Sequence, residues 1–272
     1  MKYYDEVIGL GQYCITSTAL RRCGLQKYSM PFDWSAGIIE EKCGLGGLAG
    51  KVDLICRDFK DFFNKEDFEN RGKNEENDVD NLWIVNTRTG IQYKHDFPSS
   101  IGFDDKFLEV KEKYLRRANR CMDILKSGKS VLFVFMARDE GFTDEYIEQQ
   151  YIKIKNYVSK YGTKCDFLYI MHDSSCSRYE KKIICINKNV KRINMNFTYS
   201  NEPYPESWNG NKKVYYPILI NGYANIHSVH NLENEIKKDF TDCISKLKKL
   251  SCNLLLYIKS CCVKYITLFK YN

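Results

Sequence analysis

Two long apolar runs place the strongest constraint on how this chain can fold. Residues 131–137 read VLFVFMA and residues 165–171 read CDFLYIM. A strand that is buried on both faces has this composition, because neither face meets water. The segment between them, residues 143–162, has its acidic residues first and its lysines last, as the dipole of a helix favours. This order predicts parallel strands joined by a crossover helix.

The same alternation extends along the chain. The opening reads as a strand at 4–10, a glycine-containing turn at 11–14 and a helix at 15–23. Residues 108–126 predict a helix whose apolar stripe consists of Val110, Tyr114, Ala118, Cys121 and Leu125. Residues 82–97 predict a β-hairpin with Gly90 in its turn. We therefore expect an α/β fold: a mostly parallel, doubly wound sheet of the Rossmann or flavodoxin type, with this inserted hairpin and a long C-terminal helix.

The domain organisation follows from where the polar residues lie. Residues 1–230 are expected to form a single α/β domain, interrupted by the charge-dense stretch 65–81, which has little to bury and reads as a mobile surface insertion. Residues 231–272 read as an amphipathic basic helix or tail. Of the formal net charge of +7, six units come from the six lysines of residues 243–272, which contain no Asp, Glu or Arg.

This charge distribution limits the partners. The first 242 residues carry only +1, which is not the basic surplus of a nucleic-acid-binding protein. The lysine-rich tail suits either docking on a protein surface or peripheral contact with an anionic membrane. The opening MKYYDEV lacks the apolar core of a secretory signal, and no span of 20 or more residues is free of Asp, Glu, Lys and Arg. We therefore expect a cytoplasmic protein, with contact at the inner membrane face as the alternative.

The sequence predicts no metal and no organic cofactor. Twelve cysteines occur without a CxxC pair, so most should be reduced and several should be small buried side chains. The opening GLGQYC matches the first two glycines of a dinucleotide-binding turn at Gly9 and Gly11. The third glycine is replaced by Cys14, and no second strand ending in an acid follows at the expected distance.

Residues that can perform chemistry follow three predicted strands. Cys14 follows the first strand, Arg138 follows 131–137, and His172 follows 165–171. The carboxyl ends of parallel strands share one edge of a sheet, so these side chains should gather there. A thiol at the start of a helix is favoured as thiolate and can act as a nucleophile. His172 and His95, each followed by an Asp, are the candidates for moving its proton.

Each candidate also has an ordinary structural interpretation. Cys14 is equally a small core residue, His172 can close its strand, and Asp33 can cap a turn. Arg138 can form an ion pair instead of binding an anionic substrate group or an oxyanion. His227 and His230 lie in a polar stretch and should be exposed.

Residues 9–34 (GLGQYCITSTALRRCGLQKYSMPFDW) resemble the opening block of DUF1796, a bacterial family described as papain-like cysteine peptidases. The matching residues are Gly11, Cys14, Leu20-Arg21, Gly24-Leu25 and the segment from Pro31 through Phe32 and Asp33 to Trp34. The segment KHDF, with His95 and Asp96, and the strand at 131–137 resemble further blocks. The resemblance implies a thiol enzyme with Cys14 as nucleophile and His95 and Asp96 in catalytic roles. It also places Gly11, Asp33 and Trp34 beside the substrate.

Two functions remain open at this stage. The first is a cysteine-dependent hydrolase or acyltransferase acting on an amide or ester of a small molecule, a peptide or a glycan. The second is a protein of surface-polysaccharide or glycan biosynthesis, acyltransferase-like or sugar-handling, in which Cys14 is not a protease nucleophile. The opening also resembles acyltransferase-like α/β proteins that act on bacterial surface polysaccharides. The 14% of aromatic residues and the basic tail suit the second function.

Overall fold

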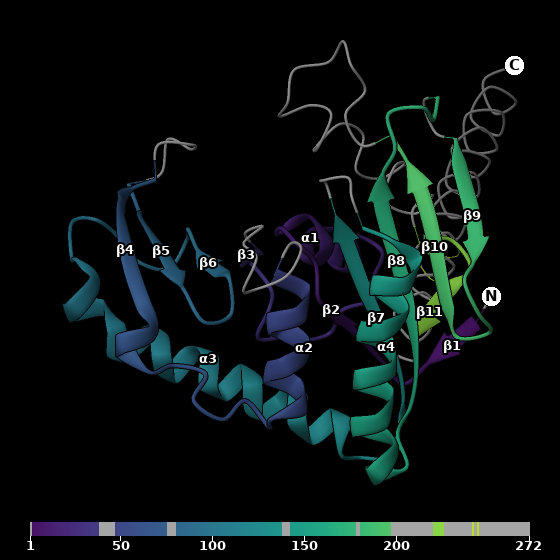
Figure 1. Ribbon diagram of the computed structural model, residues 1–272, viewed down its shortest axis with the longest axis horizontal. Coiled ribbons are helices and arrows are strands. Elements are labelled where there is room, and N and C mark those ends of the chain that lie inside the picture. Colours follow the sequence, from purple (N-terminus) through teal and green to yellow (C-terminus); the bar gives the residue numbers. More distant parts are fainter. Residues whose placement is uncertain are drawn as a thin grey trace, which may run out of the picture. The chain divides into compact units, whose positions relative to one another are not determined.

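The computed structural model describes residues 2–37, 47–74, 80–137, 142–177, 180–196 and 220–225, together with residues 241 and 244 (Figure 1). The chain divides into two compact units, Met1–Ser228 and Val229–Asn272. The elements described below belong to the first unit. The C-terminal helix predicted over 231–272 falls, except for residues 241 and 244, outside the described residues, as do His227 and His230.

A five-stranded sheet in the order β2-β7-β8-β10-β9 forms the centre of the first unit. The first four strands pair in parallel, and β9 joins the edge antiparallel to β10. The strands are β2 (Glu6–Gly9), β7 (Ser130–Ala137), β8 (Lys164–His172), β9 (Lys181–Cys185) and β10 (Val190–Met195). The predicted α/β fold with a mostly parallel sheet is therefore confirmed.

The doubly wound topology is not confirmed. Such a sheet reverses its strand order once, and ligands bind at the reversal. The parallel strands of the five-stranded sheet instead follow one another across it in chain order. The strand predicted over 4–10 is also divided: β1 (Lys2–Tyr4) pairs in parallel with β11 (Tyr223–Asn225) in a separate two-stranded sheet.

A second sheet is antiparallel, in the order β3-β6-β5-β4. Its strands are β3 (Ala36–Gly37), β4 (Phe68–Lys73), β5 (Leu82–Asn86) and β6 (Ile91–Tyr93). The predicted hairpin is β5–β6, and Gly90 adopts φ 71° in its turn. The first part of the surface insertion predicted over 65–81 contains η2 (Lys65–Asp67) and the paired, mostly exposed strand β4, and its mobility stays a prediction. An exposed edge strand needs backbone partners on one side only, so polar side chains suffice for it.

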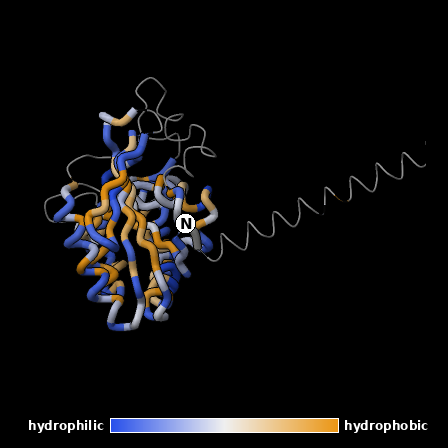
Figure 2. The backbone as a smooth tube through the Cα atoms, turned by 90° about the vertical axis from the view of Figure 1, so that its right-hand side faces the viewer, coloured by the Kyte–Doolittle hydropathy of each residue, from blue (hydrophilic) through white to orange (hydrophobic). Residues whose placement is uncertain are grey.

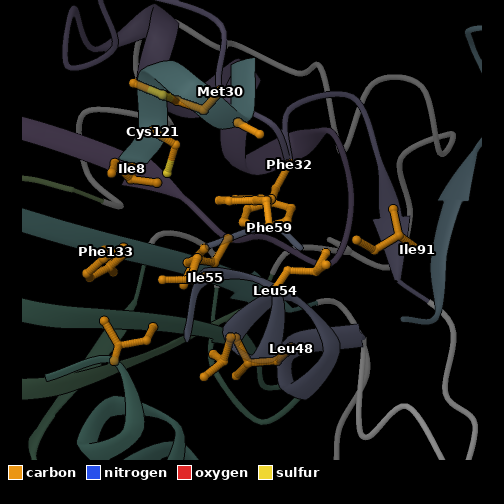
Figure 3. Close-up of a cluster of buried hydrophobic side chains, with 14 of the residues drawn as sticks. Ile8, Met30, Phe32, Leu48, Leu54, Ile55, Phe59, Ile91, Cys121 and Phe133 are labelled. Atoms are coloured by element: carbon orange, nitrogen blue, oxygen red, sulfur yellow. The ribbon is translucent and has the colours of Figure 1, made fainter. Parts of the chain in front are cut away.

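One hydrophobic core joins three helices to one face of the central sheet. The helices are α2 (Leu48–Cys56), α3 (Phe103–Leu125) and α4 (Asp144–Val158), and a short η3 (Ser159–Tyr161) follows α4. All five stripe residues predicted for α3 are buried. Figure 2 shows apolar residues concentrated along the strands of the sheet. In Figure 3, the stacked rings of Phe32 and Phe59 lie next to Leu54 and Ile55 of α2.

The opposite face of β2 is covered by α1 (Ile15–Arg22). A Cβ atom on Gly9 would lie 3.3 Å from Thr16 Cγ2 and 3.4 Å from Leu20 Cδ1, and a Cβ atom on Gly11 would overlap the Thr16 side chain. The two glycines of GLGQYC thus allow a helix to lie directly on the strand that precedes it. Gly24, at φ 66°, ends the helix as predicted.

Side chains of the N-terminal strand β1 bind a buried carboxylate near the start of β8, at the end of the five-stranded sheet opposite to Cys14. Asp166, near the start of β8, accepts hydrogen bonds from Tyr4 Oη and Asn189 Nδ2, both at 2.6 Å, and from Lys2 Nζ. The Tyr4 ring also stacks on Tyr223 of β11. Segments from both ends of the first unit therefore meet at one place.

We predict that Gly11→Ala lowers the free energy of unfolding by about 2–3 kcal/mol, because the new methyl group has to displace Thr16. Gly9→Ala is the matched control on the same face, where the nearest atom leaves almost enough room, and its cost should stay below about 1 kcal/mol. Urea denaturation measures both. Equal effects of the two substitutions would contradict the proposed packing.

Candidate active site

The turn that carries Cys14 is a continuation of β2. Leu10 and Gln12 still donate their N–H groups to Val134 and Met136 of β7, at 2.8 and 3.0 Å. The chain then bends, and Cys14 becomes the first residue before α1, with φ −57° and ψ −15°. The residue is half-buried, and its carbonyl oxygen accepts a hydrogen bond from the Thr18 N–H at 3.0 Å. Cys14 thus lies directly before the first turn of α1.

Most other described thiols are in surroundings that disfavour the thiolate. Burial raises the pKa of Cys23 and of Cys165 to about 12, and that of Cys56 to about 11. Cys121 is fully buried on α3, and its pKa is raised as well. By contrast, Cys185 on β9 is exposed.

Asp33 fastens the loop after α1 to that helix. It is fully buried and accepts hydrogen bonds from Ser17 Oγ and the Met30 N–H, each at 2.7 Å, and from Gln26 Nε2. Burial raises the pKa of its carboxyl group, and these donors partly offset that rise. The next residue, Trp34, adopts the left-handed φ of 63°, and the Arg21 guanidinium lies 5.0 Å from its ring. Asp33 therefore lies against the first half of α1 with its carboxylate hydrogen-bonded to the protein itself, whereas Trp34 lies beside Arg21 in the last turn of that helix.

Lys51 of α2 belongs to this group of residues and is missing from the sequence-based predictions. It is fully buried, and its Nζ donates to the carbonyl oxygens of Gly11 and, at 3.3 Å, of Leu10. Burial lowers its pKa to about 7, although the nearby Asp33 opposes this shift. A signal for it is present in the sequence: Lys51 follows Leu48 by three residues and precedes Ile55 by four, on the apolar stripe of LAGKVDLIC.

His172 is the last residue of β8 and lies at the same edge of the sheet as Cys14. The strands β2 and β8 flank β7, so their backbones lie about 10 Å apart. The Gln12 N–H donates to the Met136 carbonyl oxygen, and the next residue of β7, Ala137, pairs with Met171 of β8. Gln12 and His172 therefore lie at nearly the same level along the strand direction. Gly9 pairs with Val134, and Val134 pairs with Leu168, so Leu168 points to the face of the sheet that α1 covers. His172 is four residues further along β8 and therefore points to the same face.

The Asp that follows His172 does not orient it. Asp173 accepts hydrogen bonds from Ser175 Oγ at 2.6 Å, from the Ser175 N–H at 2.9 Å and from Asn194 Nδ2 at 3.1 Å. These bonds, chiefly that from the Ser175 hydroxyl, lower the pKa of Asp173 to about 2. Asp173 therefore closes the turn after β8.

His95 and Asp96 lie at the α3 end of β6. Asp96 is buried and accepts hydrogen bonds from Tyr114 Oη, at 2.7 Å, and from Lys113 Nζ, both on α3. The His95 side chain is exposed. At the other end of β6, Ile91 pairs with Gly37, whose N–H donates to the Gln12 carbonyl at 2.6 Å. The four residues from Ile91 to His95 span up to about 13 Å, so the topology separates His95 from the Cys14 turn, and their pairing stays a prediction.

Arg138 lies outside the described residues. The residues that are described contain no group of three or more His, Cys, Asp or Glu side chains placed to hold a metal ion. Within that same part of the chain, no helix combines the length and the apolar character that crossing a membrane requires.

We predict that the lowered pKa of Lys51 makes the protein more stable as the pH rises above 7. Between about pH 7 and 10.5 the unfolded chain keeps the Lys51 proton while the folded chain has lost it, so the free energy of unfolding rises with pH. Urea denaturation at pH 7 and 9.5 should show that Lys51→Met removes a rise of up to about 3 kcal/mol. Lys60→Met, at an exposed lysine of the same region, should leave the rise in place. A rise that is unchanged in Lys51→Met would contradict the assignment.

Comparison with known proteins bears on the identity of this site. A viral relative, "Uncharacterized protein R408" of Acanthamoeba polyphaga mimivirus, is 25% identical over 185 residues, which cover 62% of this chain and 78% of that protein. The expectation of a bacterial family is thus not supported. No solved structure matches the chain. The model of one protein family matches residues 5–174, a range that includes β2, the Cys14 turn, the antiparallel sheet and His172. The chain belongs to this family, which is described as "Putative papain-like cysteine peptidase (DUF1796)".

Proposed function

We propose that this protein is a cysteine-dependent enzyme that acts on an amide or ester bond, with Cys14 as its nucleophile and His172 as its general base and acid. The observation that carries the proposal is the position of Cys14 at the start of α1, on the same edge and the same face of the sheet as His172. Membership of a family described as cysteine peptidases supports the thiol chemistry.

In the proposed reaction the Cys14 thiolate adds to the carbonyl carbon of the substrate, after His172 has taken the thiol proton. The N–H groups at the start of α1 stabilise the oxyanion that forms. Protonated His172 then gives its proton to the departing amine or alcohol, which leaves a thioester on Cys14. Water then attacks the thioester carbonyl while His172 accepts a proton from that water. Protonated His172 passes this proton to the departing Cys14 sulfur, which releases the acid product and regenerates the free thiol.

The geometry favours His172 over His95 as the partner of Cys14. The backbone of His172 ends about 10 Å from β2, which the two side chains can bridge from one face. His95 lies beside α3, at the end of β6 remote from the bond between Gly37 and Gln12. An anion-binding role of Arg138 and membrane contact through residues 243–272 stay proposals from the sequence. The glycan-biosynthesis function receives no support from the family match.

We predict that Cys14 is the fastest-reacting thiol of the native protein. Alkylation by iodoacetamide at pH 7, followed by peptide mass mapping, should modify Cys14 at least tenfold faster than Cys185, which is exposed but does not begin a helix. Cys14→Ala should abolish acyl transfer from p-nitrophenyl acetate, whereas Cys185→Ala should retain it. If Cys14 is alkylated no faster than Cys185, the proposal is wrong.

We predict that His172→Gln lowers the alkylation rate of Cys14 at pH 7 by ten- to a hundredfold, because the thiol loses the base that removes its proton. His95→Gln is the matched control and should leave this rate within about twofold of the native value. Both variants are compared over pH 5–9. The opposite ranking would assign the base to His95, as the resemblance to the family first implies.

A further inference from the structure

A buried lysine binds the turn that leads to Cys14. The Nζ of Lys51 donates to the Gly11 and Leu10 carbonyl oxygens, and the centroid of the Phe32 ring lies 5.8 Å from it. The side chain has no exposure to solvent. An ammonium group loses its hydration there, so its retention in the folded chain depends on the backbone oxygens that it meets.

Lys51 acts where the sheet offers no strand. Among the described residues, β2 is the outer strand of its sheet and pairs with β7 alone. Leu10 and Gln12 turn their N–H groups toward β7, and the carbonyl of Gly11, between them, points to the opposite side. The lysine supplies the hydrogen-bond donor that a neighbouring strand would otherwise supply.

The support behind Lys51 is rigid. Gly50, the preceding residue, packs so closely on the β5–β6 turn that a Cβ atom would overlap the Thr89 carbonyl. The next link of the turn, the Gln12 carbonyl, is held at 2.6 Å by the N–H of Gly37 in β3. Two consecutive residues before Tyr13 and Cys14 are therefore fixed by the antiparallel sheet and by the helix that packs on it.

We propose that Lys51 is a positioning residue of the Cys14 site, whose side-chain amino group donates to the carbonyl oxygen of Gly11, holds the main chain there and thereby fixes the thiol at the start of α1. Lys51 does not reach the substrate, because it is enclosed by the protein. The inference rests on the proposed function of Cys14. It adds that the reactivity of the thiol depends on a buried hydrogen-bond donor and on a fixed backbone, besides the imidazole.

Lys51→Met tests this directly, because it keeps the length and volume of the side chain while removing the charge and the donor. Exchanging a buried charge for an apolar side chain of similar volume is often tolerated by a fold. The alkylation rate of Cys14 by iodoacetamide is measured from pH 5.5 to 9 by peptide mass mapping. At pH 7 it should fall at least tenfold, and the inflection of its pH profile should move to higher pH, with the rate of Cys185 unchanged.

Two further variants separate positioning from general damage to the fold. Lys113→Met removes another lysine that binds the protein interior, through Asp96, and should leave Cys14 at its native rate. Lys51→Gln keeps an N–H donor without the charge and should retain part of the rate; it also carries the test if Lys51→Met does not fold.

The inference is overturned by a Cys14 rate within twofold of native in a folded Lys51 variant, or by an equal loss in Lys113→Met. Failure of both Lys51 variants to fold would also overturn it, since Lys51 would then serve the fold and not the site. If Cys14 of the native protein is alkylated no faster than Cys185, this result counts against the proposed function, whatever the Lys51 variants show.

Discussion

The parallel pairing of β7 with β2 on one side and β8 on the other decides both the core and the site. It buries both faces of β7, so that α2, α3 and α4 cover one face while α1 covers the other at β2. It also aligns the carboxyl ends of the three strands. The Cys14 turn and His172, which are separated by more than half of the chain, reach one edge only because of this pairing.

The local parts of this fold could be predicted from the sequence, because periodicity and turn chemistry act within a few residues. The stripe on α3, the hairpin at Gly90 and the end of α1 at Gly24 depend on near neighbours alone. The strand order could not be predicted, since partners are chosen across long stretches of chain. The edge strand β4 was hidden by its polar composition, which is compatible with either a loop or a solvent-exposed edge.

The turn that carries Cys14 was predictable from the sequence, and the surroundings of the other candidate residues were less so. Two glycines, a cysteine and a helix in immediate succession identify the Cys14 turn. The Asp that follows each histidine carried no such information, because successive side chains of extended backbone point to opposite sides. Asp96 accordingly binds α3, and Asp173 binds its own turn. Lys51 could not be predicted as part of the site, because lysine side chains are ordinarily exposed at the surface.

The pairing of β1 with β11 shows that the folded unit extends beyond the part of the chain that matches the family. The family match ends at residue 174, whereas β8 pairs with β10 and β1 pairs with residues 223–225. A chain truncated after residue 174 would leave the edge of β8 open along its whole length. Unpaired edges of this kind recruit other chains, so such a fragment should aggregate even though it contains Cys14 and His172.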